Sequence, residues 1–279
     1  MTWMSTEAPS GIQLAGAGHG STKSAGAAMM SDPMIGSGDS VAALEHGLVD
    51  HDAEGEGVWI RGGMGFLAGA LTDQHFLARG RLGRLLAVLD ARQDVRLAYG
   101  VDENTAIVVR GDHAAVVGAS GVVVVDMRPA RRDGTGQGFR NARMFLLGDG
   151  DRFLPGSGEA VPSVAKAPVP AADPESTPPP PVPTEPWIDD AFARFLVPFA
   201  PYPAPGAILP AGRFVVRLSK PDGFRVLARP GRGAYRGPDA LFAGPLTLDL
   251  VPKDSPDAKP PAPAEPPEPK GPKRRPRTG

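Results

Sequence analysis

A proline-rich stretch divides this chain and limits where a hydrophobic core can form. Residues 163–186 read SVAKAPVPAADPESTPPPPVPTEP, a composition that favours extended polyproline II structure and buries little apolar surface. Because the composition changes near residue 160, we expect a folded domain over residues 1–160 and a linker over 161–186. Apolar residues return in 187–252, which predicts a small β-rich appendage, and the proline- and charge-rich residues 253–279 predict a disordered basic tail.

The residues before the linker alternate between helix-like and strand-like segments. Residues 24–32, SAGAAMMSD, are typical of a helix start. Residues 73–92 predict a helix, because Leu82, Leu85, Leu86 and Leu89 recur at three- and four-residue spacing. Runs of β-branched and apolar residues between turns predict strands at 96–100, 105–111, 113–118, 121–127 and 142–153. This alternation indicates an α/β domain.

The appendage has a similar but shorter pattern. A short amphipathic helix is predicted within residues 187–200, and strands are predicted within 212–219, 223–229 and 245–251.

Charge and composition exclude several classes of function. Lys plus Arg number 30 against 31 Asp plus Glu, a net charge of −1, which gives no global field for nucleic acid or an anionic membrane. The absence of cysteine excludes disulfides and thiolate metal sites and fits a reducing compartment. Apolar runs such as 113–127 fall short of the roughly 20 residues of a membrane span, and the N-terminus has no signal-peptide pattern. We therefore expect a cytoplasmic protein without nucleic-acid or membrane partners.

Ser24 is the candidate nucleophile. It is followed by a small residue, Ala25, and two places later by a glycine, as a crowded turn into a helix requires. In that geometry the N–H of Ala25 is aimed at the position of an oxyanion. The alternative is that Ser24 only caps the helix.

A nucleophilic serine needs a base and an orienting acid. His75 is the most suggestive of the five histidines, and no pair of these histidines sits at metal-ligand spacing with a carboxylate partner. Arginines follow it at positions 79, 81 and 84 and could bind substrate carboxylates. Glu103, between two predicted strands, is the candidate acid. The alternatives are a helix-entry histidine with solvated arginines and a carboxylate in a turn.

Four segments in this order resemble the cyanophycinase family, serine peptidases related to dipeptidase E: TKSAGAAMMSDPMI, LTDQHFLARGRLGRLL, YGVDENTAIVV and AVVGASGVVVVD. LLGDGDRF at 146–153 looks like the family's closing strand. The resemblance covers about residues 21–155. It implies a flavodoxin-like three-layer sandwich similar to class I glutamine amidotransferases, with Ser24 as nucleophile, His75 as base and Glu103 orienting it. Substrate-cleft candidates are Gln74, Arg79, Arg81 and Arg84.

The reaction that the resemblance implies is hydrolysis of cyanophycin, a poly-aspartate with arginine on each side chain, or of related aspartyl peptides. The product would be β-Asp-Arg, formed through an acyl-enzyme without a cofactor or metal; a homodimer is left open. An amidotransferase-type reaction would use a cysteine nucleophile, which this chain lacks.

The chain departs from the family pattern at two places. The usual elbow GTSAGA reads TKSAGA here, so Lys23 stands beside the nucleophile. The family also has βα units before the serine, which predicts a domain incomplete at its N-terminus. A catalytically inactive fragment or a binding module is therefore the alternative to an enzyme.

Overall fold

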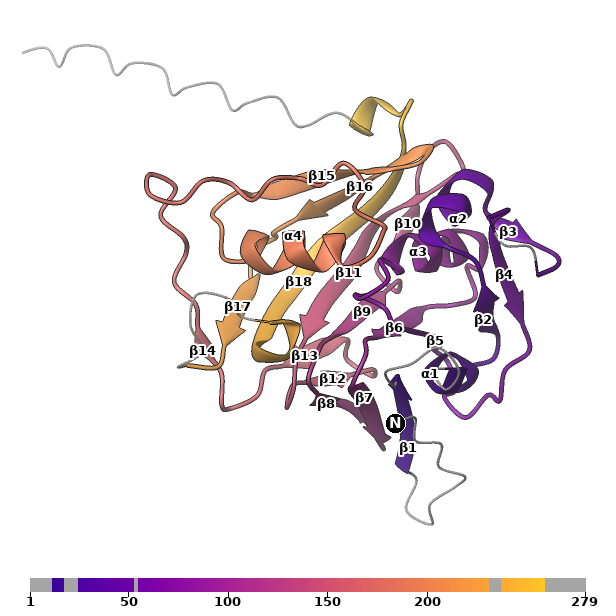
Figure 1. Ribbon diagram of the computed structural model, residues 1–279, viewed down its shortest axis with the longest axis horizontal. Coiled ribbons are helices and arrows are strands. Elements are labelled where there is room, and N and C mark those ends of the chain that lie inside the picture. Colours follow the sequence, from indigo (N-terminus) through magenta and orange to yellow (C-terminus); the bar gives the residue numbers. More distant parts are fainter. Residues whose placement is uncertain (1–11, 18–24, 53–54, 231–236, 259–279) are drawn as a thin grey trace, which may run out of the picture.

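The computed structural model describes residues 12–17, 25–52, 55–230 and 237–258, whose strands form three sheets (Figure 1). The largest sheet contains β5 (Leu71–Gln74), β6 (Leu97–Val101), β9 (Val122–Asp126), β10 (Arg131–Arg132), β11 (Phe139–Leu147), β14 (Ala167–Pro168), β15 (Gly206–Ala211), β16 (Phe214–Ser219), β17 (Arg225–Ala228) and β18 (Leu241–Pro252). The second contains β1 (Ile12–Ala17), β7 (Thr105–Arg110), β8 (His113–Gly118), β12 (Arg152–Leu154) and β13 (Glu159–Val161). The third contains β2 (Met34–Ser37), β3 (Leu48–Val49) and β4 (Val58–Arg61).

Helices are few and short in the described residues. The α-helices are α1 (Ala25–Met29), α2 (Ser40–His46), α3 (Leu82–Ala91) and α4 (Ala191–Phe199), and the 3₁₀ turns are η1 (Pro238–Ala240) and η2 (Pro256–Ala258). Mixed sheets with these helices make an α/β fold, as the sequence predicts. No helix in the described ranges is long and apolar enough to cross a membrane.

The large sheet has the order β14-β17-β18-β11-β9-β6-β5, with β10 paired to β11 and the β15–β16 hairpin paired to β18. Most described pairs are antiparallel. The parallel pairs are β5–β6, at one edge of the large sheet, and β3–β4. Parallel neighbours end at the same edge of a sheet, so β5 and β6 bring the residues that follow them together.

The centre of the large sheet is covered on both faces. Every residue of β9 is buried, with Val123 and Val125 in one core cluster and Val122 and Val124 in another. Side chains alternate between the faces of a strand, so the two clusters lie on opposite sides of the sheet. A strand buried on both faces needs no polar alternation, which explains the uninterrupted valine run.

The two covering layers differ in kind. Helices α2, α3 and α4 contribute Leu44, Leu85 and Leu196 to the first cluster. The second sheet contributes Ile107 and Phe153 to the other cluster, where α1 also packs. Helices, large sheet and second sheet therefore form three layers (Figure 1).

The helix predicted over 73–92 begins only at Leu82, so that prediction is wrong for its first nine residues. Residues 71–74 pair with β6 as strand β5. His75 and Gly80 then adopt left-handed backbone angles, with φ of +47° and +56°, which a right-handed helix excludes. The four leucines that carried the prediction are all buried, as their spacing indicates.

The strands predicted before the linker are present, with one difference at the last. The predicted strand 142–153 is the end of β11 and the first two residues of β12, joined by a turn. In that turn the N–H of Asp151 donates to the carbonyl of Gly148 at 3.1 Å, and the N–H of Gly148 donates to the Asp151 carboxylate at 2.8 Å. The stretch expected as a closing strand therefore changes sheets within its length.

Residues 187–252 form the predicted helix and strands, but these continue the large sheet instead of forming a separate one. Strand β18 pairs with β11 along most of its length, and α4 packs in the same core cluster as α3. Part of the expected linker is also attached, since β14 pairs with β17 and the buried Lys166 donates to Asp151 at 2.6 Å. Of the expected tail, 259–279 lie outside the described residues.

Gly100 of β6 tests how tightly the edge of the large sheet is packed. A β-carbon there would lie 2.3 Å from the ring of Phe76, which is fully buried. We expect Gly100→Ala to lower the free energy of unfolding by about 1–3 kcal/mol, the usual cost of overpacking. Gly62→Ala is the matched control, because no atom lies within 4 Å of its β-carbon position; its change should stay within about 0.5 kcal/mol. Urea unfolding measures both, and equal effects would contradict the packing argument.

Candidate active site

His75 directly follows β5 and is almost completely buried. Its side chain is 1% exposed, and its φ of +47° lies in the left-handed region. That conformation is sparsely populated for a residue with a side chain and costs on the order of 1–3 kcal/mol. Such strain is retained where the surrounding structure fixes it, and it often marks a functional position.

Glu103 reaches His75 from the end of β6. Its Oε1 lies 2.9 Å from Nδ1 of His75, although the two residues are 28 positions apart. Since a carboxylate can only accept, Nδ1 carries the proton and Nε2 carries the lone pair. Within the described part of the chain, Nε2 is shielded from solvent and has no hydrogen-bond partner. The imidazole therefore offers an available proton acceptor on the side opposite Glu103.

The surroundings of His75 favour the neutral imidazole. Burial lowers the pKa of His75 below its ordinary value, and the positive charge of Arg79 lowers it further. The hydrogen bond from His75 to Glu103 opposes this shift. The histidine is thus held in the form that a general base requires.

Ser24, the predicted nucleophile, and Lys23 beside it lie outside the described residues. Ala25, whose N–H is the predicted oxyanion donor, is the first residue of α1. Helix α1 is tied to the strand that leads to His75, because the Thr72 hydroxyl donates to the carbonyl of Ala27 at 2.5 Å. The same hydroxyl lies 3.1 Å from that of Ser31.

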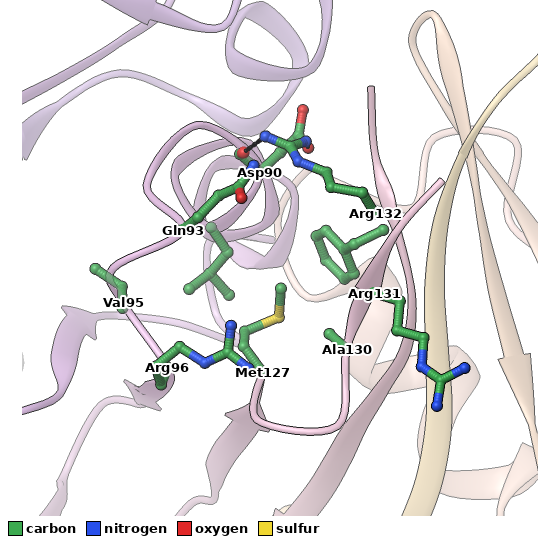
Figure 2. Close-up of a pocket in the computed structure, with 10 residues that line it drawn as sticks. Asp90, Gln93, Val95, Arg96, Met127, Ala130, Arg131 and Arg132 are labelled. Atoms are coloured by element: carbon green, nitrogen blue, oxygen red, sulfur yellow. Dashed lines mark hydrogen bonds and ion pairs between the residues drawn. The ribbon is translucent and has the colours of Figure 1, made fainter. Parts of the chain in front are cut away.

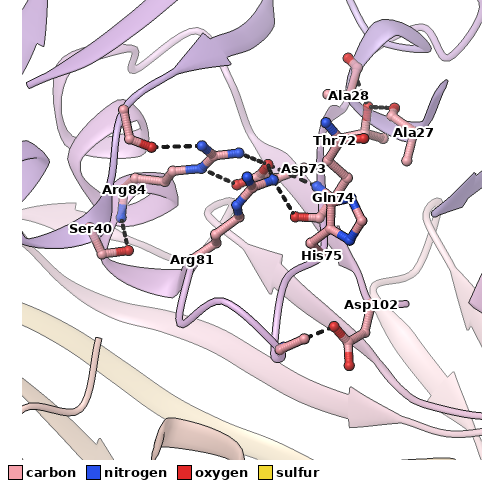
Figure 3. Close-up of polar contacts among 12 residues, drawn as sticks. Ala27, Ala28, Ser40, Thr72, Asp73, Gln74, His75, Arg81, Arg84 and Asp102 are labelled. Carbon is pink, nitrogen blue, oxygen red and sulfur yellow. Dashed lines mark hydrogen bonds and ion pairs between the residues drawn. The ribbon is translucent and has the colours of Figure 1, made fainter. Parts of the chain in front are cut away.

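Asp73 organises the arginines that follow His75, although we assigned it no role from the sequence. Its carboxylate is fully buried and binds the Arg84 guanidinium, with Nε donating to Oδ2 at 2.8 Å. Figure 3 shows Arg81 and Arg84 both directed toward it. Burial alone would raise the pKa of Asp73, but the charge of Arg84 and its hydrogen bonds hold that pKa below the ordinary value.

The predicted substrate-cleft residues differ in their surroundings. Arg84 is buried, and its guanidinium binds Asp73 and the carbonyl of Gly38, so its observed contacts are with the protein. Arg81 is less buried and donates to the Gln74 carbonyl at 2.8 Å; burial lowers the pKa of Arg81 to about 10. The side-chain oxygen of Gln74 is buried and has no partner in the described part of the chain. Substrate contact by Gln74, Arg79, Arg81 and Arg84 stays a prediction.

A small pocket lies at the other end of β6 (Figure 2). Its cavity of about 40 Å³ is lined by Arg96 and Met127 and bordered by the Asp90–Arg132 ion pair. This space holds a few water molecules at most. The pocket is too small for a peptide. It is also separate from the His75–Glu103 pair, because neither of those residues lines it.

No group of three or more metal-ligating side chains occurs in the described ranges. The buried His75, with Nε2 unpartnered in the described residues, is the group here that can support general acid–base chemistry.

Comparison with known proteins gives relatives for about half of the chain. No protein-family profile matches. A cyanophycinase of Synechococcus elongatus is 35% identical over 138 residues, covering 47% of this chain and 40% of the relative. Those of Geminocystis herdmanii and a Nostoc species are 33% and 34% identical, with 47% and 43% of the relative covered. The chain thus spans less than half the length of these curated relatives, and over the matched stretch it is similar to cyanophycinases.

The Asp73–Arg84 pair should contribute to stability in a pH-dependent way. Because the pKa of Asp73 is lowered in the folded state, its contribution is present above the unfolded pKa of about 4 and is lost as the pH falls through the folded value. We expect Asp73→Asn to lower the free energy of unfolding by about 3–5 kcal/mol near neutral pH, since it leaves Arg84 buried without its counter-charge. Below pH ~4 the free energies of unfolding of the variant and the wild type should become more similar.

Asp94→Asn is the control for that experiment. Asp94 pairs with Arg92 at 2.7 Å, but its side chain is 63% exposed, and exposed pairs contribute little. Urea unfolding across pH measures both variants. If the loss of unfolding free energy in Asp73→Asn does not change with pH, the pH-dependent contribution assigned to the Asp73–Arg84 pair is contradicted.

Proposed function

We propose that this relative of the cyanophycinases is a serine-type peptidase that hydrolyses cyanophycin or related aspartyl peptides, releasing β-Asp-Arg. The observation that carries the proposal is the His75–Glu103 pair: a buried imidazole with Nδ1 held at 2.9 Å by a carboxylate and Nε2 without a partner in the described residues. A serine hydrolase needs this arrangement of base and orienting acid. The likeness to relatives named cyanophycinase supports the choice of substrate.

In the proposed mechanism, Nε2 of His75 takes the proton from the Ser24 hydroxyl as its oxygen attacks the scissile carbonyl carbon. Glu103 stabilises the imidazolium that forms, and the N–H of Ala25 donates to the oxyanion. Collapse of this intermediate breaks the C–N bond, and His75 returns its proton to the leaving amine. Water then attacks the acyl-enzyme with His75 again as base, which frees the product and regenerates Ser24.

The substrate in this proposal is a chain of aspartates that carry arginine on their side chains. Arg79 and Arg81 are the more accessible cations near His75 and would bind its carboxylates, with the buried Arg84 supporting them through Asp73. Gln74 would offer a polar contact beside the base.

The alternative is an inactive fragment or a binding module of the same family. It would keep the fold and bind a peptide without cleaving it. A direct assay of cleavage separates these two functions.

The first test is release of β-Asp-Arg from purified cyanophycin by the 279-residue chain. We expect Ser24→Ala and His75→Ala each to reduce release by at least about 10³-fold, because a triad acts as a unit. His113→Ala is the matched control: Nδ1 of His113 lies 3.1 Å from Asp112, but this pair lies at the start of β8 and its carboxylate is exposed. The control should cleave like wild type. A folded wild-type chain without activity would favour the inactive alternative.

The pH dependence of cleavage gives a second test. His75 must be neutral to act as base, and its pKa is below the ordinary value of about 6.5. We therefore expect activity to rise with pH with a midpoint below 6.5. Glu103→Gln should move this midpoint lower still and reduce kcat, because it removes the negative charge that favours the imidazolium. A midpoint above 6.5 in the kcat/KM profile would argue against His75 as the base.

A further inference from the structure

Asp102, beside Glu103, makes three hydrogen bonds that the proposed reaction leaves unexplained. It is 5% exposed. Its Oδ1 accepts the N–H of Leu77 at 3.1 Å and the N–H of Ala78 at 2.9 Å. Its Oδ2 accepts the Ser120 hydroxyl at 2.5 Å. A buried carboxylate that accepts several bonds holds its donors firmly, because charge-assisted hydrogen bonds are stronger than neutral ones.

The two backbone donors belong to the turn that immediately follows His75. That turn has one other described hydrogen bond to the end of β6, from the N–H of Phe76 to the carbonyl of Val101 at 3.3 Å. Figure 3 shows Asp102 lying below His75 with its carboxylate directed at this turn. Asp102 thus fixes the backbone on one side of the imidazole while the next residue, Glu103, holds the imidazole itself.

Ser120 extends this connection to a third segment. Its N–H donates to the Thr105 hydroxyl at 2.9 Å, and its own hydroxyl donates to Asp102. The loop between β8 and β9 therefore supports the carboxylate that supports the His75 turn. Within the described residues, neither Asp102 nor Ser120 forms a hydrogen bond with the imidazole.

We propose that Asp102 is the positioning residue of this site: it holds His75 in its left-handed conformation so that Nδ1 meets Glu103 and Nε2 is presented to the nucleophile. Its importance for catalysis rests on the proposed function, whereas its effect on the geometry of His75 does not. The conformation of His75 is sparsely populated, so it needs an anchor in the adjacent backbone. The Asp102 side chain accepts two hydrogen bonds from that backbone.

The test compares Asp102→Ala with Asp102→Asn and Ser120→Ala. Asparagine keeps an oxygen that can accept both N–H groups, whereas alanine removes it. We expect Asp102→Ala to lower kcat about 100-fold, the effect of a displacement of roughly 1 Å at a catalytic group, while KM for soluble β-Asp-Arg oligomers changes little. Asp102→Asn should keep most of the activity, and Ser120→Ala should fall between the two.

A spectroscopic readout separates positioning from mere stability. The Nδ1 proton shared with Glu103 should give a downfield NMR resonance in the folded chain, assigned by its loss in His75→Gln. Asp102→Ala should lose or shift this resonance while the rest of the spectrum stays folded, and Asp102→Asn should retain it. Asp249→Ala is the control, since Asp249 is also buried and accepts one backbone N–H, from Asn141 at 2.8 Å, but β11 and β9 separate its strand from β6.

The outcomes distinguish the proposal from the function on which it draws. If Asp102→Ala retains both the resonance and kcat, or if Asp249→Ala has the same effects, the positioning role is overturned. If the wild-type chain shows the resonance but does not cleave cyanophycin, the proposed function fails. In that case, loss of the resonance in Asp102→Ala still tests whether Asp102 positions His75.

Discussion

The buried ion pair between Asp73 and Arg84 is the constraint on which the candidate site depends. Asp73 is in β5 and Arg84 is in the first turn of α3, so the pair joins the strand to the helix across the loop that contains His75. A fully buried carboxylate without a cation would be very costly. Strand and helix must therefore keep this spacing, and the loop between them, which starts with His75, must span a fixed distance.

The parallel pair β5–β6 at the edge of the large sheet brings the residues of the candidate site together. Because β5 and β6 are parallel, the residues after them emerge at the same edge. His75 follows one strand and Glu103 follows the other, and both His75 and Asn104 adopt left-handed conformations there. Strand ends of this kind are where α/β sheets usually place their binding groups. Strand β9, which pairs antiparallel with β6 and is buried along its whole length, supplies the rigid support.

Much of the fold could be predicted from the sequence, and the differences have physical reasons. The strands of 96–127 were predictable because β-branched runs between turns have few alternatives. The predicted helix over 73–92 is too long at its N-terminal end. Residues 71–74 pair with β6 as a strand, and only Leu82–Ala91 form the helix. Residues 187–252 looked like an appendage because a proline-rich stretch precedes them. Composition does not reveal that β18 pairs with β11.

Some residues of the candidate site could likewise be predicted from the sequence, and others could not. His75 and Glu103 stood out through the pattern of segments around them, and the structure brings their side chains together. Asp73 and Asp102 did not stand out, because their partners are a buried guanidinium in one case and backbone N–H groups in the other. A backbone N–H is present at nearly every position, so no residue pattern marks the ones that a carboxylate will accept. The groups proposed to perform the chemistry are therefore easier to predict from sequence than the groups that hold them in place.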